Sequence, residues 1–149
     1  MMPVETPTHV TGTIDFKSGA IGTLIMSFDT FTAVDYPNIE IYGTEGTLRV
    51  PDPNMFGGEV KLRKPGEKEW KTLEHTHTYD GNCRGVGVLD LAVAIRQERE
   101  HRANGHLALH VLEAMYGFHA AAETGKHYRL KNDCEPPEPL PEDGISSKS

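Results

Sequence analysis

The stretch that decides the fold runs from Ile39 to Val50 and reads IEIYGTEGTLRV. Apolar residues alternate with polar ones in both of its halves, which is the period of two typical of half-buried β-strands. Gly43 and Gly46 bracket the middle, where glycine can take positive φ without steric cost and so favours a tight chain reversal. The stretch therefore predicts a β-hairpin.

Alternation also predicts strands on both sides of this hairpin, at His9 to Phe16, Ala20 to Asp29, Glu59 to Lys64 and, as a weaker edge strand, Trp70 to His75. The second of these strands differs from the others. It has Leu24 and Met26 on one face, and Ile21 and Ile25 on the opposite one. A strand that is apolar on both sides is usually covered on both. We therefore expect helices on one side and a partner subunit or domain on the other.

After Cys83 the apolar period changes from two to about 3.6, which predicts helices. The first helix is expected from Gly85 to His101, with Gly105 as the stop after it. The second is expected from near His106 to Gly125. Its core-facing stripe is expected to consist of Leu107, Val111, Met115, Phe118 and Ala122.

Lys126 to Leu130 is a candidate last strand, and residues 134–149, rich in Pro, Glu, Ser and Lys, predict a flexible tail. Strands followed by helices indicate an α+β fold. We expect a single domain over residues 1–149, built on an open, mainly antiparallel β-sheet. Two main helices would pack on one face of the sheet and leave the other face available for oligomerisation.

The composition excludes several classes of protein. With 149 residues, 37% of them hydrophobic, the chain is long enough for one domain with a core. A net charge of −7 argues against a nucleic-acid partner, because phosphate binding needs a basic surface. No apolar run approaches the roughly 20 residues needed to cross a bilayer, and the N-terminal residues lack the features of a signal peptide. Cys83 and Cys134 share no motif, so a reduced pair and a cytoplasmic location are expected.

Several motifs suggest chemistry, and each has a plainer alternative. Gly85-Val86-Gly87 precedes a helix, but Asp90 stands where a dinucleotide loop has its third glycine, which favours a simple glycine-rich helix start. His106, His110 and Glu113 share a helix face and could bind a metal, although surface histidines are the more common case.

Other polar residues carry weaker signals. His75 and His77 share a strand face, and Cys83 beside Arg84 is either a reactive or an incidental thiol. The charge run from Glu98 to Arg102 is most simply the solvated end of a helix.

Several stretches together resemble the C-terminal domain of the glucose–fructose oxidoreductase / inositol dehydrogenase / rhizopine-catabolism family (Gfo/Idh/MocA). The matching segments are Gly12-Thr13-Ile14-Asp15-Phe16 with Ser18 to Thr23, Ile39 to Asn54 with Phe56-Gly57-Gly58, Asn82 with Arg84 to Gly87, and His101 to Gly105 leading to Leu109 to Glu113. The order and spacing of these segments together carry the resemblance.

The resemblance implies the substrate-shaping and oligomerisation domain of an NAD(P)-dependent sugar or polyol oxidoreductase. In that family a Rossmann domain binds NAD or NADP and supplies a catalytic lysine in a Glu-Lys-Pro motif, and an Asp-x-x-x-His motif opens the second domain. This sequence contains none of these three features. We therefore expect it to correspond to the second domain alone. It would hold no cofactor, metal or catalytic residue of its own, and so would carry out no hydride transfer by itself.

From their positions before and between the helices, we expect Asn82, Arg84 and His101 to contact substrate. The expected partners are a second copy through the sheet face, a separate or fused Rossmann domain, and a sugar or polyol. The alternative is a stand-alone protein-binding or assembly module without an enzyme parent.

Overall fold

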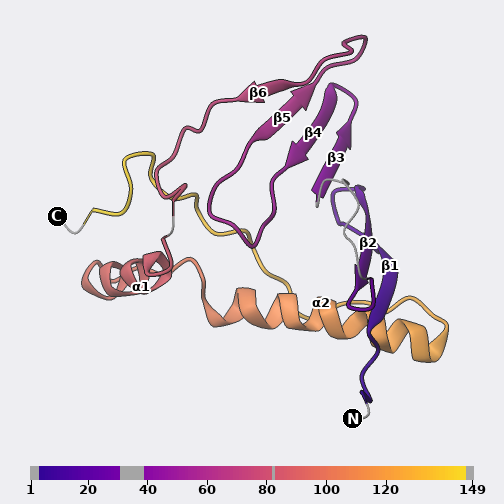
Figure 1. Ribbon diagram of the computed structural model, residues 1–149. Helices are drawn as coiled ribbons and strands as arrows, with labels where there is room; N and C mark the ends of the chain where they lie inside the picture. Colours follow the sequence, from indigo (N-terminus) through magenta and orange to yellow (C-terminus); the bar gives the residue numbers. More distant parts are fainter. Residues whose placement is uncertain (1–3, 31–38, 82, 147–149) are drawn as a thin grey trace. The chain divides into compact units, whose positions relative to one another are not determined.

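The computed structural model describes residues 4–30, 39–81 and 83–146. It contains two helices and six strands, and every strand pair is antiparallel (Figure 1). The α+β class is thereby confirmed. The strands divide into a two-stranded sheet, β1-β2, and a four-stranded sheet, β3-β4-β5-β6. The sequence patterns do not predict this division, because alternation along a strand carries no information on strand order.

The chain forms two compact units, each of which combines distant parts of the sequence. The first consists of residues 1–34 and 105–135, and the second of residues 35–104 and 136–149. The first unit therefore contains β1, β2 and α2, and the second contains the four-stranded sheet and α1.

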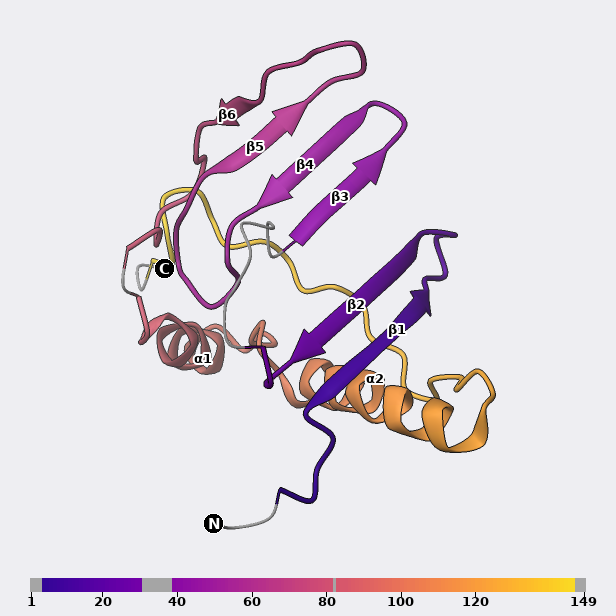
Figure 2. The same cartoon turned by 45° about the vertical axis from the view of Figure 1, so that its right-hand side comes forward.

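In the first unit, β1 (His9–Asp15) and β2 (Ile21–Ser27) form a hairpin that packs through β1 against α2 (Gly105–Thr124) (Figure 2). Gly12 makes this close packing possible. A Cβ atom at that position would lie 2.6 Å from Cε1 of Phe118, well inside the contact distance of two carbon atoms. Glycine is thus required where the strand crosses the aromatic ring.

The segment that follows α2 is not a strand, so the prediction for Lys126 to Leu130 is wrong. Its polar groups are satisfied in another way. The backbone N–H groups of Lys131 and Asn132 each donate to the Glu113 carboxylate of α2 at 2.8 Å. The Glu113 side chain thus accepts hydrogen bonds that the carbonyl groups of a neighbouring strand would accept in a sheet.

In the second unit, β3 (Ile39–Gly43) and β4 (Gly46–Val50) form the predicted hairpin, and β5 (Val60–Arg63) and β6 (Lys71–Leu73) extend it. The register places Ile41, Leu48 and Leu62 on one face of the sheet. The opposite face carries polar and charged side chains. This alternation is the one expected of a sheet with an apolar side and a polar side.

Helix α1 (Val86–Arg96) ends earlier than predicted. Glu98 takes a positive φ of 52°, and the N–H of Arg99 donates to the carbonyl of Ala94 at 3.1 Å, which closes the helix in a Schellman-type turn. The predicted continuation to His101 is therefore wrong. Gly105, predicted to stop this helix, is instead the first residue of α2.

Few apolar side chains are buried among the described residues. Val93 and Ala94, at 4% and 1% exposure, are the buried hydrophobic ones. The accessible surface is 12899 Å², whereas two separate compact domains of these sizes would together expose about 9,000 Å². The fold therefore leaves an unusual amount of surface uncovered, and 20 large hydrophobic side chains among the described residues are exposed. In the described part of the chain, no helix is long and apolar enough to span a membrane.

Candidate functional site

A carboxylate is buried in the middle of α1. Asp90 lies one turn after Val86 and one turn before Val93, so it falls on the buried side of the helix, and it is only 4% exposed. A buried charge is costly unless it is paired and hydrogen-bonded. The side chains around Asp90 supply these partners.

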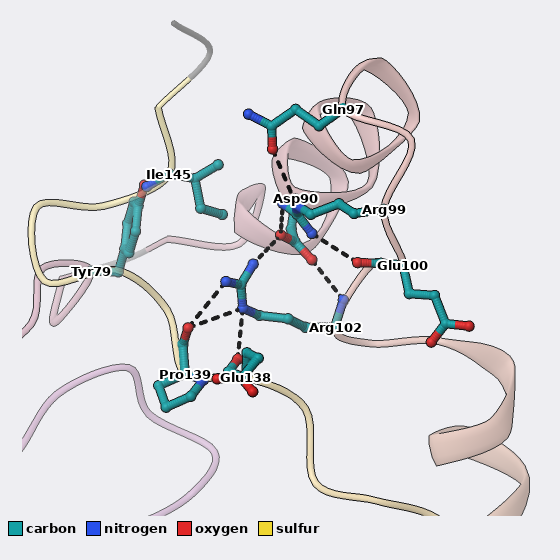
Figure 3. A network of polar contacts seen from close by, with 9 residues as sticks. All are labelled: Tyr79, Asp90, Gln97, Arg99, Glu100, Arg102, Glu138, Pro139 and Ile145. Atoms are coloured by element: carbon teal, nitrogen blue, oxygen red, sulfur yellow. Dashed lines mark hydrogen bonds and ion pairs between the residues drawn. The ribbon is translucent and has the colours of Figure 1, made fainter. Parts of the chain in front are cut away.

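Two arginines from the loop after α1 turn back to this carboxylate (Figure 3). Arg99 donates from Nη2 to Oδ1 at 2.7 Å, and Arg102 forms an ion pair with the same oxygen through Nη1. The backbone N–H of Arg102 donates to Oδ2 at 2.7 Å. Burial alone would raise the pKa of Asp90, but these hydrogen bonds outweigh it and lower that pKa below its usual value. Asp90 is therefore ionised at neutral pH.

Arg102 also reaches the C-terminal segment. Its Nε donates to the carbonyl of Glu138 at 2.8 Å, and its Nη2 donates to the carbonyl of Pro139 at 3.0 Å (Figure 3). Farther along, the backbone N–H of Ile145 donates to the hydroxyl of Tyr79 at 2.8 Å. The guanidinium group thus joins α1, the loop after it and the C-terminal segment. How mobile residues 134–149 are stays a prediction.

The three predicted substrate residues have different surroundings. Asn82 lies outside the described residues. Arg84 is exposed just before α1 and, within the described ranges, has no ion-pair partner. His101 is half-buried. The residues on either side of it are held by hydrogen bonds: Arg99 Nη1 donates to the carbonyl of Glu100 at 2.9 Å, and the backbone N–H of Arg102 donates to Asp90. No hydrogen bond joins Arg84 to His101 in the described part of the chain, and their role in substrate binding stays a prediction.

The arginines of this network correct one expectation. The charge run from Glu98 to Arg102 is not simply a solvated helix end, since two of its members turn inward to Asp90. The sequence feature that indicates this network is Asp90, which falls on the apolar side of α1. A carboxylate buried there needs a cation beside it. All oxygens of Asp90 are engaged, so the network can position the His101 loop but offers no free general base.

A second polar cluster covers the charged face of the four-stranded sheet. The guanidinium carbons of Arg49 and Arg63 lie 4.3 and 4.7 Å from the centre of the Trp70 ring. Arg49 also donates from Nε to Glu40 at 2.7 Å, and the hydroxyl of Tyr42 donates to the same carboxylate. The Tyr42 hydrogen bond, followed by that of Arg49, lowers the pKa of Glu40. These contacts pair the charges with one another and hold the strands in register.

The third feature is the candidate metal site on α2, His106, His110 and Glu113. Among the residues that the structure describes, no three His, Cys, Asp or Glu side chains are grouped to hold an ion. Glu113 is occupied by Lys131, Asn132 and Tyr128, and the hydrogen bonds from the backbone N–H groups of Lys131 and Asn132 do most to lower its pKa to about 2. His110 Nδ1 lies 2.9 Å from the carbonyl of Asn132. Both side chains thus hold the segment after α2 against the helix.

No protein-family model matches this chain, and no curated protein or solved structure shows significant similarity to it. The family resemblance described above therefore gains no support from these comparisons and stays a prediction.

Proposed function

We propose that this chain is a substrate-shaping and oligomerisation domain of an NAD(P)-dependent sugar or polyol oxidoreductase, and that it transfers no hydride by itself. The observation that carries the proposal is the apolar surface that the fold leaves exposed. A domain with so little buried hydrophobic area gains stability when other protein surface covers it.

The two-sided strand supports this assembly role. On β2, Ile21 and Ile25 are 73% and 71% exposed on the face opposite to the one that carries Leu24. Apolar side chains on a sheet face away from the domain's own helix are suited to contact with another subunit. This is the sheet face through which we propose that the chain meets a second copy.

The substrate-shaping role rests on the loop at the end of α1. The Asp90 network holds the residues on both sides of His101 in place, which restricts where its imidazole can lie. Arg84 carries a guanidinium group that is suited to hydroxyl or carboxylate groups of a ligand. The nicotinamide cofactor and the acid–base residue would come from a Rossmann domain outside this sequence, in a cytoplasmic enzyme.

A turnover assay tests the catalytic part of the proposal. The purified chain is mixed with NAD or NADP and a panel of sugars and polyols, and the absorbance of the reduced cofactor is followed. We expect no rate above the protein-free control. A clear rate that scales with protein concentration would contradict the proposal.

The second candidate is a stand-alone assembly module with no enzyme parent, which the same exposed apolar surface also favours. Ligand binding separates the two. Under the first proposal, calorimetric titration with the same panel gives a binding signal that is weakened by Arg84→Met. If no sugar or polyol binds while the chain still associates, the assembly module is the better account.

A further inference from the structure

Helix α2 has a second apolar side. The side that bears Glu113 and Gly117 is buried in the first unit. The opposite side exposes Leu109, Val111, Leu112, Met115 and Tyr116, at 47%, 48%, 61%, 56% and 58%. Three of the five residues of the predicted core stripe (Val111, Met115 and Ala122) are thus exposed, and that prediction is wrong for them.

These exposed residues form one continuous surface, which we call the outer stripe: residues 108, 109, 111, 112, 115, 116, 119, 122 and 123. With 100° between successive residues, they fall within roughly 160° of the helix circumference. His119 and Glu123 are its only members whose side chains can carry a charge near neutral pH. A soluble helix normally has charged and polar residues opposite its buried face. A helix that is apolar on both sides packs against protein on both sides.

The outer stripe has the dimensions of a subunit interface. Its five large side chains retain roughly 100 Å² each, and with the smaller residues between them the stripe offers on the order of 600–800 Å², close to the about 800 Å² per partner of a standard interface. It spans most of the 20 residues of α2. Because the stripe has few charged side chains, most charges of a highly charged partner would be left without an ion pair in the interface.

We propose that the outer stripe of α2 pairs with the same stripe of a second copy of this chain, antiparallel and about a two-fold axis. This inference rests on the proposed function, because it names the partner and one surface of the oligomer. The argument for a second copy is that the stripe is self-complementary. Its midpoint lies between Met115 and Tyr116, and an axis placed there overlaps the two stripes over their full length.

The contacts in such a pair follow from the helix geometry. Met115 lies level with Tyr116 of the other helix beside the axis, and Leu112 lies level with His119 of the other helix. Toward the ends, Leu109 lies level with Ala122 and Ala108 with Glu123. The largest side chains thus occupy the centre and each pair at the ends includes an alanine, which allows the helices to approach within the usual 8–10 Å and to cross at a moderate angle.

Disulfide trapping tests this geometry directly. In full-length chain with Cys83→Ala and Cys134→Ala, Tyr116→Cys places two thiols beside the axis, within the roughly 7 Å Cα separation that a disulfide permits. Ala108→Cys is the matched control. Its two copies would lie about 22 Å apart along the helices, so that oxidation cannot join them. We expect cross-linked dimer from Tyr116→Cys and none above background from Ala108→Cys.

A charge substitution gives the second measurement. Leu112→Glu should weaken association through the outer stripe at least about a hundredfold, seen as loss of the Tyr116→Cys cross-link, because two-fold symmetry places the new charge in the interface twice. Val4→Glu, at a 72% exposed residue outside the helix, should leave association unchanged. Circular dichroism checks that the variant keeps its helix content.

The outcomes separate this inference from the proposed function. A chain that associates but does not cross-link at residue 116, or that cross-links equally at residue 108, overturns the helix pairing and leaves the oligomerisation proposal standing. A chain that remains a monomer overturns both.

Discussion

Replacing Asp90 with alanine should destabilise the second unit more than any surface substitution. The change removes three hydrogen bonds to a carboxylate that is 5% exposed at its side chain, and it leaves Arg99 and Arg102 without their counter-ion. Breaking a fully buried ion pair costs about 3–5 kcal/mol. Because the two arginine side chains are 32% and 22% exposed, water replaces part of what is lost. We therefore expect a cost of about 2–4 kcal/mol.

Urea unfolding followed by the fluorescence of the single tryptophan, Trp70, measures this cost, since that residue belongs to the same unit. With a typical dependence on urea, the midpoint should fall by about 1–2 M. Hydrogen exchange adds a local measurement, because the Arg102 amide that donates to Asp90 should lose its protection. Glu69→Gln, at an exposed turn of the same unit, is the control and should leave the midpoint unchanged. An Asp90→Ala midpoint within about 0.2 M of the parent, with that amide still protected, would refute the reasoning.

Four further substitutions test other parts of the structure. The pKa of Glu113 is lowered from its ordinary value of 4.5 to about 2. The ionised carboxylate therefore stabilises the fold at pH values above 4.5, and this stabilisation is lost as the pH falls from 4.5 toward 2. Glu113→Gln should make the urea midpoint less dependent on pH over that range. Gly12→Ala should cost about 1–3 kcal/mol of folding stability by forcing a Cβ into Phe118. Gly87→Ala in α1, where the added Cβ meets nothing within 4 Å, should instead stabilise the fold by up to about 1 kcal/mol. Thermal unfolding should show a lower midpoint for the first variant and a higher one for the second. Trp70→Leu should cost about 1–2 kcal/mol by removing the ring under two guanidinium groups, which the circular dichroism melting curve reports.

Local patterns predicted the elements of this fold better than their ends and their contacts. The alternation around Gly43 and Gly46 predicted the central hairpin because a strand's period of two is a property of the backbone. The sequence pattern does not predict the end of α1, because Glu98 takes the left-handed conformation that is typical of glycine. No local signal marks such a residue.

The contacts of the candidate site depend on segments that are far apart in the sequence. Arg102 binds carbonyl groups 36 and 37 residues away, and Glu113 binds backbone groups 18 and 19 residues away. Periodicity predicts that α2 is a helix, but it cannot tell which side faces the domain when both sides are apolar. The position of Asp90 within an apolar stripe was the one signal in the sequence that pointed to a buried network.

Sedimentation equilibrium of the full-length chain, over a concentration series from low micromolar to near millimolar, tests the central claim most directly. That claim is that the exposed apolar surface is covered by a second copy. The account predicts a mass that rises with concentration to at least twice that of one chain. A single mass equal to one chain across the whole series would contradict it.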